Sequence, residues 1–75
     1  MKSPTRQEVT EVFNRARLLG AAAFAAGKTR VPALDSELRA RMASERYQIG
    51  DARCLARLDG WIRGWDEANL AAPVE

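Results

Sequence analysis

Apolar side chains recur every three or four residues along three stretches of the chain, which is the spacing of an α-helix with one buried face. The first stretch opens either at Ser3, with Pro4 at the first helical position, or at Thr5, with Glu8 at capping-box spacing. Asp51 precedes the third stretch as an N-cap. Pro73 stops the third helix, because proline cannot continue one. The expected helices cover residues about 4–27, 35–47 and 51–72. The sequence therefore predicts an all-α fold, a small three-helix domain spanning residues 1–75.

The inner face of the first helix carries small residues, whereas that of the third carries both tryptophans. Bulky indoles can fill the groove that small side chains leave, because protein interiors are closely packed. We therefore expect the long first and third helices to pack as a hairpin, with the short middle helix bracing one side. The residues expected in the structural core are Phe13, Ala16, Gly20, Ala23, Gly27, Leu58, Trp61 and Trp65.

Gly60 and Gly64 form a second strip of small residues on the flank of the third helix. This strip meets either another helix of the same chain or a partner, which can be a second copy. Leu18 lies opposite the inner face of the first helix and requires a packing neighbour or a partner of its own. The residues predicted for a possible protein interface are Leu18, Gly60, Gly64, Asp66 and Glu67.

Length and composition limit the classes of function. The chain has 75 residues, 47% of them apolar, which is enough for one small domain with a marginal core. A homodimer or an obligate partner would add the apolar burial that such a core lacks. There is no histidine and a single cysteine, Cys54, so a metal site lacks its usual ligands. We expect no catalytic residues, no cofactor and no small-molecule substrate, because Cys54 faces the core and Asp59 lies on the polar face.

Charge is unevenly distributed, although the net charge is only +2. Between Asn14 and Arg63 there are ten Lys and Arg against five Asp and Glu, whereas Gly64–Glu75 has three acids and no base. A basic region of this kind attracts phosphate groups and acidic protein surfaces. The candidates for nucleic-acid or partner contact are Lys28, Arg30, Arg39, Arg41, Arg46, Arg53 and Arg57.

No segment predicts contact with a membrane. The longest uncharged stretch, Leu18–Gly27, is far shorter than the roughly 20 residues that a bilayer requires. Met1–Pro4 leads into a charged helix rather than an apolar signal core. We therefore expect a cytoplasmic protein.

Two motifs in about half of the chain resemble the ribosome modulation factor family and its short phage-borne relatives. One is Ala-x-x-x-Gly in the first helix, with a further glycine seven positions on and a turn that contains proline; the other is a closing Trp-x-x-Gly-Trp-x-x-Ala. The matching residues are Ala16, Gly20, Gly27, Pro32, Trp61, Gly64, Trp65 and Ala68. The resemblance implies a small bacterial protein that binds ribosomal RNA and protein surfaces and helps inactivate ribosomes in slow growth. It carries over the basic turn residues Lys28 and Arg30 as contacts.

Two hypotheses of function follow, and both describe a non-catalytic binding module that modulates a large assembly. In the first, which the resemblance favours, the basic residues bind the ribosome or its RNA. In the second, the chain is a phage-type inhibitor or adaptor that docks exposed helix faces on a host protein complex. Binding to RNA falls steeply with salt, whereas an apolar protein interface does not.

Overall fold

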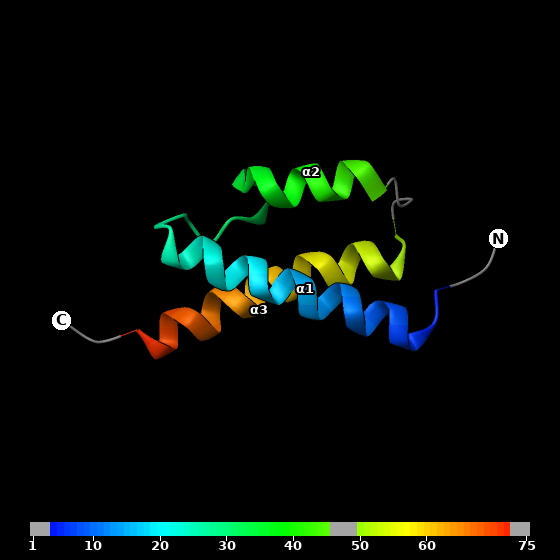
Figure 1. The fold of residues 1–75 in the computed structure, drawn as a ribbon, viewed down its shortest axis with the longest axis horizontal. Helices are drawn as coiled ribbons and strands as arrows, with labels where there is room; N and C mark the ends of the chain where they lie inside the picture. Colours follow the sequence, from blue (N-terminus) through cyan, green and yellow to red (C-terminus); the bar gives the residue numbers. More distant parts are fainter. Residues whose placement is uncertain (1–3, 46–49, 73–75) are drawn as a thin grey trace.

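Three α-helices make up the fold of the computed structural model, which describes residues 4–45 and 50–72. The helices are α1 (Arg6–Ala25), α2 (Ser36–Glu45) and α3 (Ala52–Ala71), and a 3₁₀ turn, η1 (Pro32–Leu34), precedes α2. No strand occurs within those described ranges. The predicted all-α class is confirmed, with two long helices packed on each other and a short helix beside them (Figure 1).

The two long helices pack on each other as expected and cross near their middles (Figure 1). They run in the same direction, unlike the antiparallel arms of a simple hairpin, because α2 follows α1 in sequence and carries the chain back before α3 begins. Their contacts follow the same order along both helices. Gly60 lies against the backbone of Phe13, and Gly64, one turn later, lies against the backbone of Arg17. Side chains from the C-terminal half of α1 therefore meet side chains from the C-terminal half of α3.

Each end of the long helices is set by a local signal. The Thr5 hydroxyl accepts the Glu8 amide at 3.1 Å, and the Asp51 carboxylate accepts the Arg53 amide at 2.8 Å. Gly27 ends α1 with φ of +78°, and the Lys28 amide then reaches back to the Ala23 carbonyl at 2.9 Å. The prediction that Gly27 belongs to the core is wrong, because this exposed glycine forms the turn that ends the helix.

Small residues from both helices meet where α1 and α3 cross. A Cβ added to Gly20 would lie 2.8 Å from the Trp61 carbonyl carbon, and one added to Gly64 would lie 2.6 Å from that of Arg17. The α3 backbone, rather than an indole, therefore fills the space at Gly20. Gly60 and Gly64 are buried in the same contact between α1 and α3. Of the two alternatives for this strip, it therefore meets another helix of the same chain. They serve helix packing, and their prediction as a partner interface is wrong.

The core lies on the α2 side of this crossing. Its fully buried centre consists of Trp61 and Leu38, with Ala16 and Ala23 from α1. Leu58 and Trp65, both predicted for the core, are partly buried and pack against this cluster. Phe13 is also only partly buried. Leu38 is 1% exposed, so its side chain is the main apolar contact by which α2 attaches to the long helices.

Candidate binding surfaces

A buried carboxylate, Asp35, joins the turn after α1 to α2 and α3. It is 3% exposed and accepts three hydrogen bonds: from Trp61 Nε1 at 2.7 Å, Lys28 Nζ at 3.1 Å and the Glu37 amide at 3.0 Å. The bond from Glu37 makes Asp35 the N-cap of α2. Burial alone would raise the pKa of Asp35, but these hydrogen bonds and the charge of Lys28 together lower it below its ordinary value.

Arg30 is also bound to α3, through a two-point ion pair with Asp66. The distances are 2.6 Å from Nε to Oδ1 and 2.8 Å from Nη2 to Oδ2. Hydrogen bonding by Arg30 lowers the pKa of Asp66. Trp65 Nε1 donates to the Lys28 carbonyl at 3.0 Å, and the Trp65 ring meets Phe24 edge to face at 5.2 Å. The basic turn is therefore folded onto α3, which the sequence did not predict for Lys28 or Arg30.

Glu67, the next residue along α3, forms a similar ion pair with Arg17. It accepts from Arg17 Nε at 2.5 Å and from Nη2 at 2.8 Å, and this bonding lowers the pKa of Glu67. Both side chains remain almost half exposed, so the pair lies at the surface. Asp66 and Glu67, predicted as a protein interface, thus each neutralise an arginine of their own chain. Arg17 was missed, because its partner lies 50 residues away in sequence.

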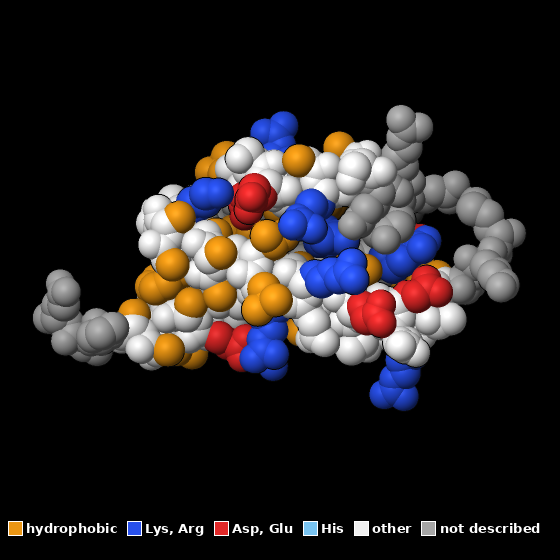
Figure 2. All heavy atoms as spheres, viewed as in Figure 1, with side chains coloured by type: hydrophobic (Ala, Val, Ile, Leu, Met, Phe, Trp, Pro, Cys, Tyr) orange, Lys and Arg blue, Asp and Glu red, His pale blue; other side chains and the backbone are white. Residues whose placement is uncertain are grey.

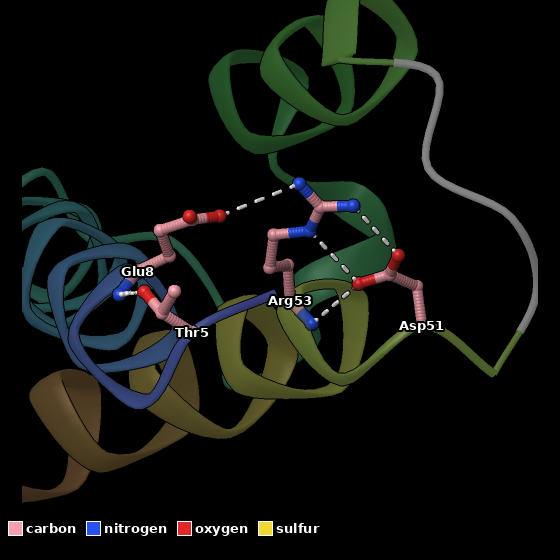
Figure 3. A network of polar contacts seen from close by, with 4 residues as sticks. All are labelled: Thr5, Glu8, Asp51 and Arg53. Atoms are coloured by element: carbon pink, nitrogen blue, oxygen red, sulfur yellow. Dashed lines mark hydrogen bonds and ion pairs between the residues drawn. The ribbon is translucent and has the colours of Figure 1, made fainter. Parts of the chain in front are cut away.

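Arg53 stands between two acidic residues at the start of α3 (Figure 3). Its guanidinium bonds Asp51 at 2.9 and 3.0 Å and lies 3.8 Å from Glu8 of α1. Arg57, one turn later, is 2% exposed. The prediction that Arg57 is a surface contact for a nucleic acid is therefore wrong, because its side chain packs inside the fold. Arg46 lies outside the described residues.

Exposed arginines remain on the α2 side of the molecule. Arg39 and Arg41 of α2 are exposed, as is Arg15 of α1, and within the described ranges none of the three forms an ion pair. Arg15 lies one turn from the buried Val12, and Arg41 lies one turn from the buried Leu38. Figure 2 shows Lys and Arg side chains across the middle of this face, between α2 and the long helices. We call Arg15 and Arg41 the arginine surface.

Arg15 was missed as a candidate, although the sequence carries a signal for it. Its position three residues after Val12 and four before Leu19 places it beside the stripe of α1 that packs toward α2. A basic residue at the border of a buried stripe remains accessible while its helix is held in place.

The other flank of the helix pair carries an open groove of about 650 Å³, whose lining mixes apolar, polar and charged side chains. Leu18, predicted as an interface residue, is 73% exposed and forms part of its wall. We call this cavity the Leu18 groove. Its lining residues are Asn14, Arg17, Leu18, Ala21, Gly64, Glu67 and Ala68. The structure thus brings three of the predicted interface residues, Leu18, Gly64 and Glu67, to one groove. Gly64 lies there against the backbone of α1 rather than at a free surface.

No known family, curated protein or solved structure matches this chain. The resemblance to the ribosome modulation factor family therefore rests on the motif residues alone. Within the described ranges, no group of three or more acidic or cysteine side chains is placed to hold a metal ion. None of the described helices combines the length and apolar character needed to cross a membrane. Cys54 is a partly buried free thiol.

The position of Asp35 predicts how stability depends on acid. Because its pKa is lowered on folding, its contribution is fully present above the ordinary carboxyl value of about 4 and is lost as pH falls through the folded value. We expect the difference in unfolding free energy between the wild type and Asp35→Asn to shrink below about pH 4. Urea denaturation at pH 7, 5, 4 and 3 measures it. A difference that stays constant down to pH 3 would show that the carboxylate is not held ionised.

Proposed function

We propose that the protein is a non-catalytic, cytoplasmic binding module that attaches through the arginine surface to an anionic part of a large assembly. Ribosomal RNA, with the protein surfaces beside it, is the target that the family resemblance favours. Attachment by guanidinium groups needs no pocket and no catalytic residue, because the phosphates of folded RNA are exposed.

The observation that supports this proposal is that, among the described residues, some basic residues are paired with acidic residues of the same chain, whereas others are exposed and unpaired. Lys28 and Arg30 are neutralised by Asp35 and Asp66, so the basic turn offers little free charge to a partner. Arg15 and Arg41, by contrast, are exposed and outside every described ion pair. A guanidinium group donates two parallel hydrogen bonds to a phosphate and stays charged at any physiological pH.

Salt dependence of binding tests the proposal. We expect the purified protein to bind ribosomes or isolated ribosomal RNA with an affinity that falls steeply as salt rises. Arg15→Ala and Arg41→Ala should each weaken binding and should each lower the slope of log affinity against log salt by about 1. Filter binding or fluorescence anisotropy between 50 and 300 mM salt, about the range in which such slopes are resolved, gives both quantities.

Arg63→Ala is the matched control. Arg63 is also exposed, but it belongs to a hollow between α1 and α3 lined by Phe13, Asp59, Ile62 and Asp66. Its removal should leave the salt slope unchanged. Equal effects of all three substitutions would mean that only net charge matters, and a flat response of the wild type to salt would exclude RNA as the target.

A protein inhibitor or adaptor remains the second candidate, because a large exposed leucine in the wall of the Leu18 groove offers an apolar contact to a protein partner. Gly64→Arg cannot test this candidate, since Gly64 lies against the Arg17 backbone and the change would separate α1 from α3. Leu18 is the usable position, because its side chain is 73% exposed.

A further inference from the structure

One side of α1 carries a narrow stripe of uncharged residues, with Glu11 along one edge and Arg17 along the other. The uncharged stripe consists of residues three or four positions apart, which share one face of a helix: Gln7, Thr10, Asn14, Leu18, Ala21 and Ala25. All are exposed except Ala21, which is partly exposed. The opposite side of α1, with Leu19 and Ala23, packs in the core with Leu38 of α2. The uncharged stripe therefore faces away from α2, on the open side of the helix pair.

Two hollows adjoin this stripe. The Leu18 groove lies along its C-terminal half, and a second hollow of about 370 Å³ lies along its N-terminal half, beside Thr10. The second hollow is walled mainly by apolar side chains, and Leu55, one of them, is 55% exposed. Its lining residues are Val9, Thr10, Phe13, Ala52, Leu55, Ala56 and Asp59. Leu18 thus projects from this face, and the second hollow adjoins the same face at Thr10, eight residues earlier in α1.

We propose that a second copy of this chain docks on the uncharged stripe, with the two α1 helices antiparallel about a twofold axis beside Asn14. Thr10 and Leu18 lie four residues to either side of Asn14. A twofold axis there places Leu18 of each copy over the hollow beside Thr10 of the other. An interface between identical surfaces requires this reciprocity, in which one residue meets a second and the second meets the first.

The charges around the uncharged stripe favour binding of a second copy of the chain there rather than binding of an RNA. About a twofold axis, a stripe of like charges would face like charges and repel the second copy, whereas this stripe brings together amide, hydroxyl and apolar groups. Glu11 and Arg17 at its edges lie three residues to either side of Asn14, so the axis places Glu11 of one copy level with the oppositely charged Arg17 of the other. The nearest lining charges, Arg17 and Glu67, already neutralise each other. RNA would need free cations at this position. The small core also favours self-association, since Trp61 and Leu38 are its only large side chains with less than 2% exposure among the described residues.

Sedimentation equilibrium across a wide concentration range tests the proposal. We expect the wild type to pass from monomer to dimer as concentration rises. Leu18→Ala removes two buried leucines from each dimer and should raise the dissociation constant about 100-fold. Leu70→Ala is the matched control, because Leu70 is 84% exposed and lies at the end of α3, outside both hollows. It should leave the dissociation constant unchanged.

Cross-linking locates the axis. In a Cys54→Ser background, Asn14→Cys should give a covalent dimer with a short bismaleimide, whereas Asn69→Cys, another exposed asparagine, should not. A chain that stays monomeric at all concentrations would overturn the proposal, as would a dimer indifferent to Leu18→Ala. Capture of a different protein at Leu18 by a monomeric chain would also overturn it and would support the inhibitor or adaptor. None of these outcomes depends on Arg15 or Arg41, so the proposal stands or falls separately from RNA binding.

Discussion

Gly64→Ala is expected to destabilise the fold by about 3 kcal/mol or more, a large part of the roughly 4–11 kcal/mol that a chain of this size has. An alanine in a helix normally stabilises it by about 1 kcal/mol relative to glycine. Here the sign is reversed, because the new Cβ would lie 2.6 Å from the carbonyl carbon of Arg17 and 2.9 Å from its Cα. These are backbone atoms of α1, so no side-chain rotation relieves the overlap. The two helices must move apart at their crossing point.

Urea denaturation followed by circular dichroism measures this effect, and Gly27→Ala is its control. Gly27 has φ of +78° with open space around an added Cβ, so alanine there costs only the backbone strain of about 1–2 kcal/mol. The expected order of stability is wild type, then Gly27→Ala, then Gly64→Ala. If Gly64→Ala were as stable as the wild type, α1 and α3 would not be in contact at this position.

Helix positions were predictable from the sequence because their signals are local. Thr5, Asp51 and Gly27 each act on groups within about one turn, and the helix ends that can be compared fall within two residues of the predicted ones. The predicted end of the second helix, at residue 47, lies outside the described residues. The choice of packing partner was not predictable in the same way. The spacing of Gly60 and Gly64 shows a narrow strip on α3, but a narrow strip fits a backbone of the same chain or of another equally well.

The candidate site was less predictable, because charge pairing is a long-range property. Lys28 and Arg30 look free in the sequence, yet their acidic partners lie 7 and 36 residues away. Arg57 was expected at the surface because arginines are rarely buried, and the structure places it inside. Leu18 was predicted correctly as an exposed apolar residue, since its helical position alone places it away from the inner face. The exposed arginines of the arginine surface emerge only after the internal ion pairs are known.

The second large effect is expected at Asp35, a residue for which the sequence showed only a helix start. Its side chain joins Lys28, Trp61 and the first turn of α2. Asp35→Ala removes an N-cap, at about 1 kcal/mol. It also leaves the Nε1 donor of Trp61, whose side chain is 0% exposed, without this partner. The loss of a buried hydrogen bond of this kind costs about 1–3 kcal/mol of stability. We expect a total loss of about 3 kcal/mol in the free energy of unfolding at pH 7.

Trp61→Phe separates the two parts of this loss, because it removes the donor while keeping an aromatic ring in the core. In a double-mutant cycle with Asp35→Ala, the two losses should fall short of additivity by about 1 kcal/mol or more, since the shared hydrogen bond is lost only once. Thermal and urea denaturation of the four proteins gives the coupling. Strict additivity would show that Asp35 and Trp61 act independently. In that case Leu38 would hold α2 to the long helices, and the Asp35 carboxylate would act on α2 only as its N-cap.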